Sequence, residues 1–165
     1  MTPIFPYQPG YASDWAGRPQ RLVIEERWLW QWWRKRYGHA FDEFWFDQPM
    51  DGVQPMDKVF TSAMQFLDPT YQRVYYAVNA KRADVIARVG EFYTIIELRK
   101  DIGPQTLGEV KMYDELARLE WPQLHWTPAI VVGRVVDQTL RKVFDQEGIR
   151  VFLSSEDESQ GELQA

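Results

Sequence analysis

Two apolar runs separated by only two residues constrain the fold of this chain more than any other stretch. Residues 83–89 and 92–98 are rich in Val, Ile, Phe and Tyr, and Gly90-Glu91 lies between them. Glycine at the first central position of a two-residue loop is typical of a type II′ β-hairpin. Since residues pair outward from such a turn, Asp84 and Glu97 are predicted to face each other on one side of the sheet.

This pairing brings like charges together at one end of an otherwise apolar hairpin. Directly facing side chains have Cβ atoms roughly 5 Å apart, and two carboxylates at that distance repel each other. Either a raised pKa or a bound cation would relieve the repulsion. A third arrangement is self-neutralising: Arg82 and Arg99 also face each other, and cross-strand ion pairs Asp84–Arg99 and Glu97–Arg82 lie within reach. In that arrangement Asp84→Asn leaves an Arg without its partner and destabilises the fold.

The hairpin resembles the core of the PD-(D/E)XK nuclease superfamily, which carries an Asp on one strand and Glu-x-Lys on the next. The matching residues here are Asp84 and Glu97-Leu98-Arg99, so Arg stands at the position of the usual Lys. The resemblance covers about residues 23–153. It implies an α/β fold with a restriction-endonuclease-like core, in which helices flank a central mixed β-sheet.

Some members of that superfamily carry Gln-x-x-x-Tyr on the helix after the Glu-x-Lys strand, and this chain has Glu109-Val-Lys-Met-Tyr113. The resemblance implies a Mg²⁺ or Mn²⁺ site with carboxylate ligands: Asp84, Glu97 and either Glu25 or Glu26 from the first helix. The implied catalytic residues are Asp84, Glu97, Arg99 and Lys111. Arg99 is permanently protonated, so it stabilises charge on a phosphate but cannot act as a base, whereas Lys111 offers an amine. For the two helical acids, stabilisation of the helix N-terminus is the simpler interpretation.

The order of predicted elements agrees with a single domain. Periodicity, caps and turn residues predict helices at 23–37, 56–67, 106–119 and 137–147, and strands at 41–46, 73–79, 129–132 and 149–153, in addition to the hairpin. The predicted organisation is an extended arm over 1–21, one α/β domain over 22–153 with an insertion at about 47–80, and an acidic tail over 154–165.

The N-terminal arm combines four prolines with aromatic side chains, which excludes a regular element. Disordered segments are usually poor in aromatic residues, so the arm is expected to pack on something. Either its own domain or a neighbouring subunit would serve. The candidate contact residues, which are expected to be largely buried, are Phe5, Tyr7, Tyr11 and Trp15.

Composition narrows the possible functions. The chain has no cysteine and only two histidines, so any metal ion would need oxygen ligands. No apolar run approaches the length of a membrane span, and the N-terminus lacks the layout of a secretory signal. With 24 acidic and 19 basic residues, the net charge of −5 disfavours strong DNA binding.

Two functions remain. The first is a non-catalytic assembly protein that uses the nuclease-like core as a scaffold within a multi-subunit complex, without a cofactor. By analogy it is a virion, neck or head–tail joining component of a tailed bacteriophage, located in the virion if phage-encoded and otherwise in the cytoplasm. The alternative is a Mg²⁺- or Mn²⁺-dependent DNA nuclease. The sequence favours the first, because Arg replaces the motif Lys and the protein is acidic.

Overall fold

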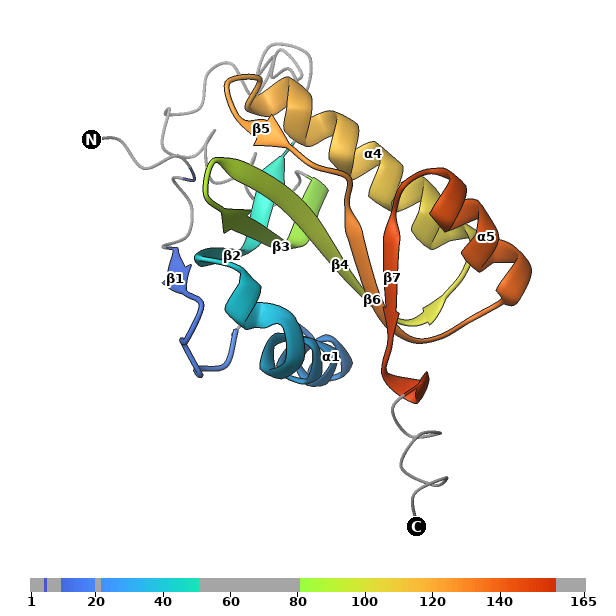
Figure 1. The fold of residues 1–165 in the computed structure, drawn as a ribbon. Coiled ribbons are helices and arrows are strands. Elements are labelled where there is room, and N and C mark those ends of the chain that lie inside the picture. Colours follow the sequence, from blue (N-terminus) through green and yellow to red (C-terminus); the bar gives the residue numbers. More distant parts are fainter. Residues whose placement is uncertain (1–4, 6–9, 20–21, 51–80, 157–165) are drawn as a thin grey trace, which may run out of the picture.

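The computed structural model of the 165-residue chain describes residues 5, 10–19, 22–50 and 81–156. Tyr7, the helix predicted at 56–67 and the strand predicted at 73–79 lie outside these residues. The described part is an α/β fold in which helices flank a mixed seven-stranded sheet (Figure 1). The predicted fold class is confirmed at this level.

The sheet joins an antiparallel half to a parallel half. Its strands are β1 (Tyr11–Ala12), β2 (Glu43–Met50), β3 (Lys81–Val89), β4 (Phe92–Ile102), β5 (His125–Trp126), β6 (Ile130–Val136) and β7 (Arg150–Leu153). They lie in the order β1-β2-β3-β4-β6-β7, and β5 pairs with β4. Strands β1 to β4 pair antiparallel, whereas β6 is parallel to both β4 and β7. Strand β4 therefore belongs to both halves.

The helices cover both faces of the sheet (Figure 1). Helix α1 (Ile24–Tyr37), which continues into the 3₁₀ turn η1 (Gly38–Ala40), packs on one face, and α4 (Pro104–Glu120) and α5 (Gln138–Gln146) pack on the other. In the part of the chain that the structure describes, no helix is both long enough and apolar enough to cross a membrane.

The predicted hairpin is confirmed between β3 and β4. Val89 pairs with Phe92 and Val85 with Ile96, as the two-residue turn requires. Gly90 has a φ of 57°, a left-handed conformation that glycine adopts without steric cost. The paired register ends at Val85–Ile96, and the strands continue beyond it toward the site described below.

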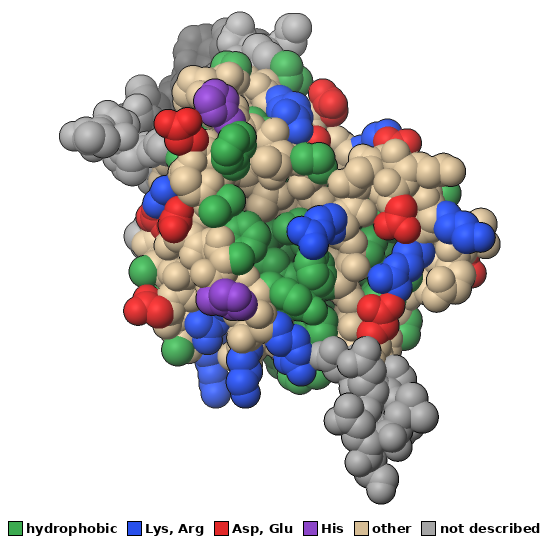
Figure 2. Space-filling view, in the orientation of Figure 1, with side chains coloured by type: hydrophobic (Ala, Val, Ile, Leu, Met, Phe, Trp, Pro, Cys, Tyr) green, Lys and Arg blue, Asp and Glu red, His purple; other side chains and the backbone are tan. Residues whose placement is uncertain are grey.

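Aromatic side chains fill both interfaces between sheet and helices. On the α1 side, Trp30 and Trp33 are fully buried, and Trp30 meets the Phe44 ring edge-on at a centroid distance of 4.8 Å. On the opposite side, Tyr113 of α4 and Phe144 of α5 are buried in a second core. Figure 2 shows hydrophobic side chains in the middle of the visible face of the molecule and several Lys and Arg side chains along its lower edge.

The described residues of the N-terminal arm pack on their own domain. Phe5 is 1% exposed, with ring centroids 4.8 Å from Trp45 and 4.9 Å from Trp121. Tyr11 stacks on Trp15 at 4.1 Å and pairs through β1 with the edge of β2. These contacts are intramolecular, which is one of the two predicted alternatives. Tyr11 and Trp15 are only half-buried, so the prediction of large burial holds for Phe5 alone among the described candidates. The short strand β1 also contradicts the prediction that the arm contains no regular element.

Strand β2 begins and ends later than the prediction of 41–46. It runs from Glu43 to Met50, so the segment assigned to an insertion starting at 47 still contributes to the sheet. Gln48 and Pro49 are weak strand formers, yet Gln48 is fully buried and both pair with β3. Tertiary packing overrides local propensity here.

The start of α4 differs from the prediction, whereas the start of α5 agrees with it. The prediction that a helix starts at Thr106, capped with the help of Glu109, is wrong. Helix α4 begins at Pro104, and the Thr106 hydroxyl accepts a hydrogen bond from the Gly103 N–H at 3.3 Å. The cap of α5 is as predicted, since Asp137 accepts from the backbone N–H groups of its first turn. The earlier start leaves the Glu109 carboxylate for other contacts.

Candidate functional site

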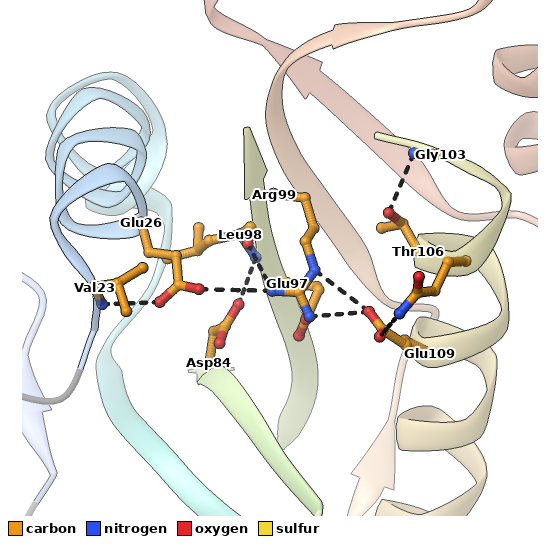
Figure 3. A network of polar contacts seen from close by, with 10 residues as sticks. Val23, Glu26, Asp84, Glu97, Leu98, Arg99, Gly103, Thr106 and Glu109 are labelled. Carbon is orange, nitrogen blue, oxygen red and sulfur yellow. Dashed lines mark hydrogen bonds and ion pairs between the residues drawn. The ribbon is translucent and has the colours of Figure 1, made fainter. Parts of the chain in front are cut away.

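A network of charged side chains lies where the β3–β4 ladder ends, between α1 and α4 (Figure 3). Just past the last paired residues, the Asp84 carboxylate accepts a hydrogen bond from the Leu98 backbone N–H at 2.8 Å. A side chain of β3 thus bonds a backbone group of β4. Because of this bond, Asp84 stays close to the Glu97–Arg99 segment.

Arg99 is at the centre of the network. Its guanidinium lies 2.7 Å from Glu97 on the same strand, 2.9 Å from Glu109 on α4 and 3.6 Å from Glu26 on α1. One cation therefore links the two helical layers across the end of the sheet. Burial lowers the pKa of Arg99, but the attraction of Glu97 and the hydrogen bond to Glu109 outweigh it, so the guanidinium stays charged.

Glu97 is the most deeply buried of the four acids. It is 1% exposed, and its Oε2 atom has no hydrogen-bond partner. Burial first, and then repulsion by Asp84, raises the pKa of Glu97 to about 9, although Arg99 opposes the shift. Buried polar atoms in proteins are nearly always paired. A proton or a cation at this oxygen would satisfy it.

The other groups show the same excess of negative charge. Burial and the nearby Glu26 raise the pKa of Asp84 to about 7, against the hydrogen bond from Leu98 and the attraction of Arg99. Burial and then Glu97 raise the pKa of Tyr113 to about 12. Among the described residues, three carboxylates pair with Arg99 and Asp84 lies nearby, so these groups together carry excess negative charge unless they take up protons or a cation.

The structure brings together most, but not all, of the predicted site residues. Asp84, Glu97, Arg99 and Glu26 meet, as the resemblance implies. Lys111 lies elsewhere, in an exposed ion pair with Glu147 at 2.5 Å. Glu25 is exposed and lines a groove between α1 and the strands β4 and β6. The sequence did not identify Glu109 as a partner of Arg99, although its place in the Glu-x-x-x-Tyr motif was the available signal.

The ion pairs differ from those of the predicted self-neutralising cluster. Arg82 bonds the Asp47 carboxylate at 2.6 Å and the Asp47 backbone oxygen at 2.7 Å. Glu97 bonds Arg99, two residues along its own strand. Asp84 bonds a backbone N–H, and Arg99 acts on it only through longer-range attraction. Removing the Asp84 charge therefore leaves Arg99 with its bonded partners.

The donor set suits a hard divalent cation. Carboxylate oxygens are the ligands that Mg²⁺ and Mn²⁺ prefer, and Glu97 Oε2 is buried without a partner. Within the described ranges, however, no three Asp, Glu, His or Cys side chains are grouped closely enough to hold a metal ion. Arg99 lies among the acids instead. Asp84 and Glu97 are the residues that fit a cation, and its binding requires the Arg99 side chain to yield some of its contacts.

Comparisons with models of protein families, with curated proteins and with solved structures gave no match.

Proposed function

We propose that the chain has a restriction-endonuclease-like core and that its acidic site binds Mg²⁺ or Mn²⁺ to hydrolyse phosphodiester bonds of DNA. The element order supports this core: α1, the three antiparallel strands β2–β4, α4 and then β6, parallel to β4. The superfamily carries its Asp and Glu-x-Lys on consecutive strands, and the corresponding residues here lie on β3 and β4.

The observation that carries the proposal is the state of Glu97. A fully buried carboxyl with one unpaired oxygen, next to a second carboxyl whose pKa is about 7, is costly unless something compensates it. A structural ion pair needs one acid for one base, whereas the described residues place four acids around Arg99. Strongly perturbed carboxyls beside a charged partner are typical of functional sites.

Each residue has a role under this proposal. A divalent cation, when bound, lowers the pKa of a water molecule and polarises the phosphate. Asp84 and Glu97 would hold the cation, and Glu97 would lose its proton to solvent when the cation binds. Arg99 binds a phosphate oxygen and stabilises the negative charge that grows there, but it cannot accept the proton of the water. Glu26 and Glu109 position the Arg99 guanidinium.

Metal-linked stability and cleavage together test the proposal. Mn²⁺ or Mg²⁺ should raise the melting temperature of the wild type and leave Asp84→Asn unchanged, because Asn lacks the charge that binds the cation. Cleavage of linear or circular DNA should require the cation and disappear in Asp84→Asn. The matched control is Asp101→Asn, an exposed acid on the neighbouring strand β4, which should behave like the wild type. A wild type that neither responds to the cations nor cleaves DNA would refute the proposal.

A second candidate is the assembly protein that the sequence favoured, a scaffold in a multi-subunit complex such as a phage neck or virion. Two observations favour it. Arg99 already connects α1, β4 and α4, so the site also contributes to the structure. In addition, α1 exposes large apolar side chains beside a groove, among them Trp28 at 49% exposure. Under this candidate, the cation and cleavage assays are negative and a partner protein binds the domain.

A further inference from the structure

A groove lies between the N-terminal half of α1 and the neighbouring strands β4 and β6. It has a volume of about 430 Å³, which is within the usual range of ligand pockets. The residues that line this α1 groove are Ile24, Glu25, Trp28, Leu29, Lys100 and Arg134. Among the described residues, none of those lining the groove forms a hydrogen bond or ion pair with Asp84 or Glu97, so the groove takes no part in the proposed chemistry.

The groove is apolar and uncovered by the described residues. Ile24 is 79% exposed and Trp28 is 49% exposed, and they lie one helical turn apart. Val23, the residue before Ile24, is also exposed, at 54%. Single exposed apolar residues are ordinary, but a contiguous group that includes Trp marks an interaction site.

Two cations from neighbouring strands flank these apolar residues. In the parallel pairing of β4 with β6, Arg99 matches Gly133 and Asp101 matches Val135. Lys100 and Arg134 therefore occupy matched positions and lie side by side. Neither side chain forms an ion pair with a described residue, although Arg88, Arg118 and Arg141 all do. In a protein of net charge −5, two such cations beside an apolar groove indicate an acidic ligand.

We propose that the α1 groove binds a segment of a partner protein that presents large apolar side chains flanked by Asp or Glu. The aliphatic lining by Ile24 and Leu29 suits protein side chains, whereas nucleic-acid grooves combine aromatic rings with many cations. With only Lys100 and Arg134, and with Glu25 at the rim, the groove is poorly equipped for a polyanion. The inference is independent of whether the acidic site binds a cation.

Selection from a random peptide library tests this surface. Peptides of about 16 residues, long enough for an extended strand or a helix of several turns, are selected on the full chain. They are then counter-selected on the triple variant Trp28→Ala, Lys100→Glu, Arg134→Glu. We expect the surviving peptides to be enriched in Asp and Glu together with large apolar residues. In fluorescence anisotropy, the triple variant should bind a selected peptide about tenfold or more weakly, because it loses both the anchor and the charge complementarity.

Controls separate this result from a general loss of structure and from the acidic site. Phe92→Ser removes another exposed apolar side chain, at the distant hairpin turn, and Asp84→Asn alters only the acidic site. Both should bind the peptide as the wild type does, and all variants are checked by thermal melting. Lys100→Glu alone should weaken binding about threefold or more and so support the role of charge.

Four results would overturn the proposal. The selection could yield no peptide that distinguishes the wild type from the triple variant. The selected peptides could show no excess of acidic residues. A labelled oligo-dT of the same length could bind more tightly than any peptide and depend on Trp28, which would make the groove a nucleic-acid surface. Sedimentation could show a dimer that the triple variant abolishes, which would identify a second copy as the occupant.

Discussion

Asp84→Asn tests the electrostatics of the acidic site most directly, because Asn keeps the shape and the hydrogen-bond acceptor and loses the charge. The folded chain raises the pKa of Asp84 from 3.8 to about 7. One pKa unit corresponds to about 1.4 kcal/mol. Ionisation of Asp84 at pH 8 therefore lowers the free energy of unfolding of the wild type by up to about 4 kcal/mol. The substitution should recover part of this energy.

The sign and the pH window follow from the direction of the shift. Near pH 3.5 the carboxyl is largely protonated in both states, so the wild type and the variant should be equally stable. Between the two pKa values, only the unfolded state ionises, and the stability of the wild type falls as the pH rises. Above pH 7 the difference is complete. Asp84 is partly accessible to solvent, and its ionisation depends on that of the neighbouring Glu97. Both effects reduce the energy that the substitution recovers, so we expect the free energy of unfolding of the variant to exceed that of the wild type by about 2 kcal/mol at pH 8.

Urea unfolding followed by tryptophan fluorescence measures this difference at about pH 4, 6 and 8, with EDTA to remove cations. The gain in the free energy of unfolding should grow from pH 4 to pH 8. Asp101→Asn should stay within about 0.5 kcal/mol of the wild type at each pH, as exposed substitutions usually do. A variant that is less stable than the wild type at pH 8 would refute the reasoning. That result would mean that Asp84 is compensated by Arg99, as the hairpin sequence alone suggested.

Three further substitutions test other contacts. Arg99→Met leaves Glu26, Glu97 and Glu109 without their shared cation, and the free energy of unfolding at pH 8 should fall by about 3 kcal/mol in urea titrations; a loss below 1 kcal/mol would contradict the central role of Arg99. Under the proposed nuclease function, Arg99→Lys introduces an amine at the position of the Lys in the superfamily that the hairpin resembles, so Mn²⁺-dependent cleavage should rise about tenfold or more in a timed plasmid assay; an unchanged rate would place this side chain away from the phosphate. Phe5→Ala empties a buried site and should cost about 3 kcal/mol in the same urea titration; a negligible cost would show that the arm does not pack on its own domain.

The hairpin was predictable because its information is local. A glycine at the required turn position and two β-branched runs determine the register from Val89–Phe92 to Val85–Ile96. The prediction stopped being accurate where the ladder ends. Beyond Ile96 the strands are no longer paired residue by residue, so the hairpin register does not predict which side chains face each other. Asp84 accepts a hydrogen bond from the Leu98 N–H and does not form the predicted ion pair with Arg99.

The rest of the site depends on contacts between segments that are distant in sequence. Glu26 on α1 and Glu109 on α4 both pair with Arg99. The residue pattern of strand β4 does not predict either contact, because both depend on how the helices pack against the sheet. The predicted pair of Arg82 with Glu97 is wrong because β2 extends past Phe46 to Met50, an extension that local strand propensity does not predict. The extension brings Asp47, with its positive φ of 52°, next to Arg82.

The position of β4 in both halves of the sheet has a consequence for the order of folding. The β3–β4 hairpin closes through a two-residue turn, whereas the parallel β4–β6 pairing must wait for the long connection through α4. Ile86→Val in the hairpin should therefore slow folding, and Val132→Ala in β6 should chiefly speed unfolding, in stopped-flow measurements. Asp84 and Glu97 then meet early, before Glu26 and Glu109 bring Arg99 into position. Folding should accordingly be faster at pH 5, where the two carboxyls can share protons during this step, than at pH 8.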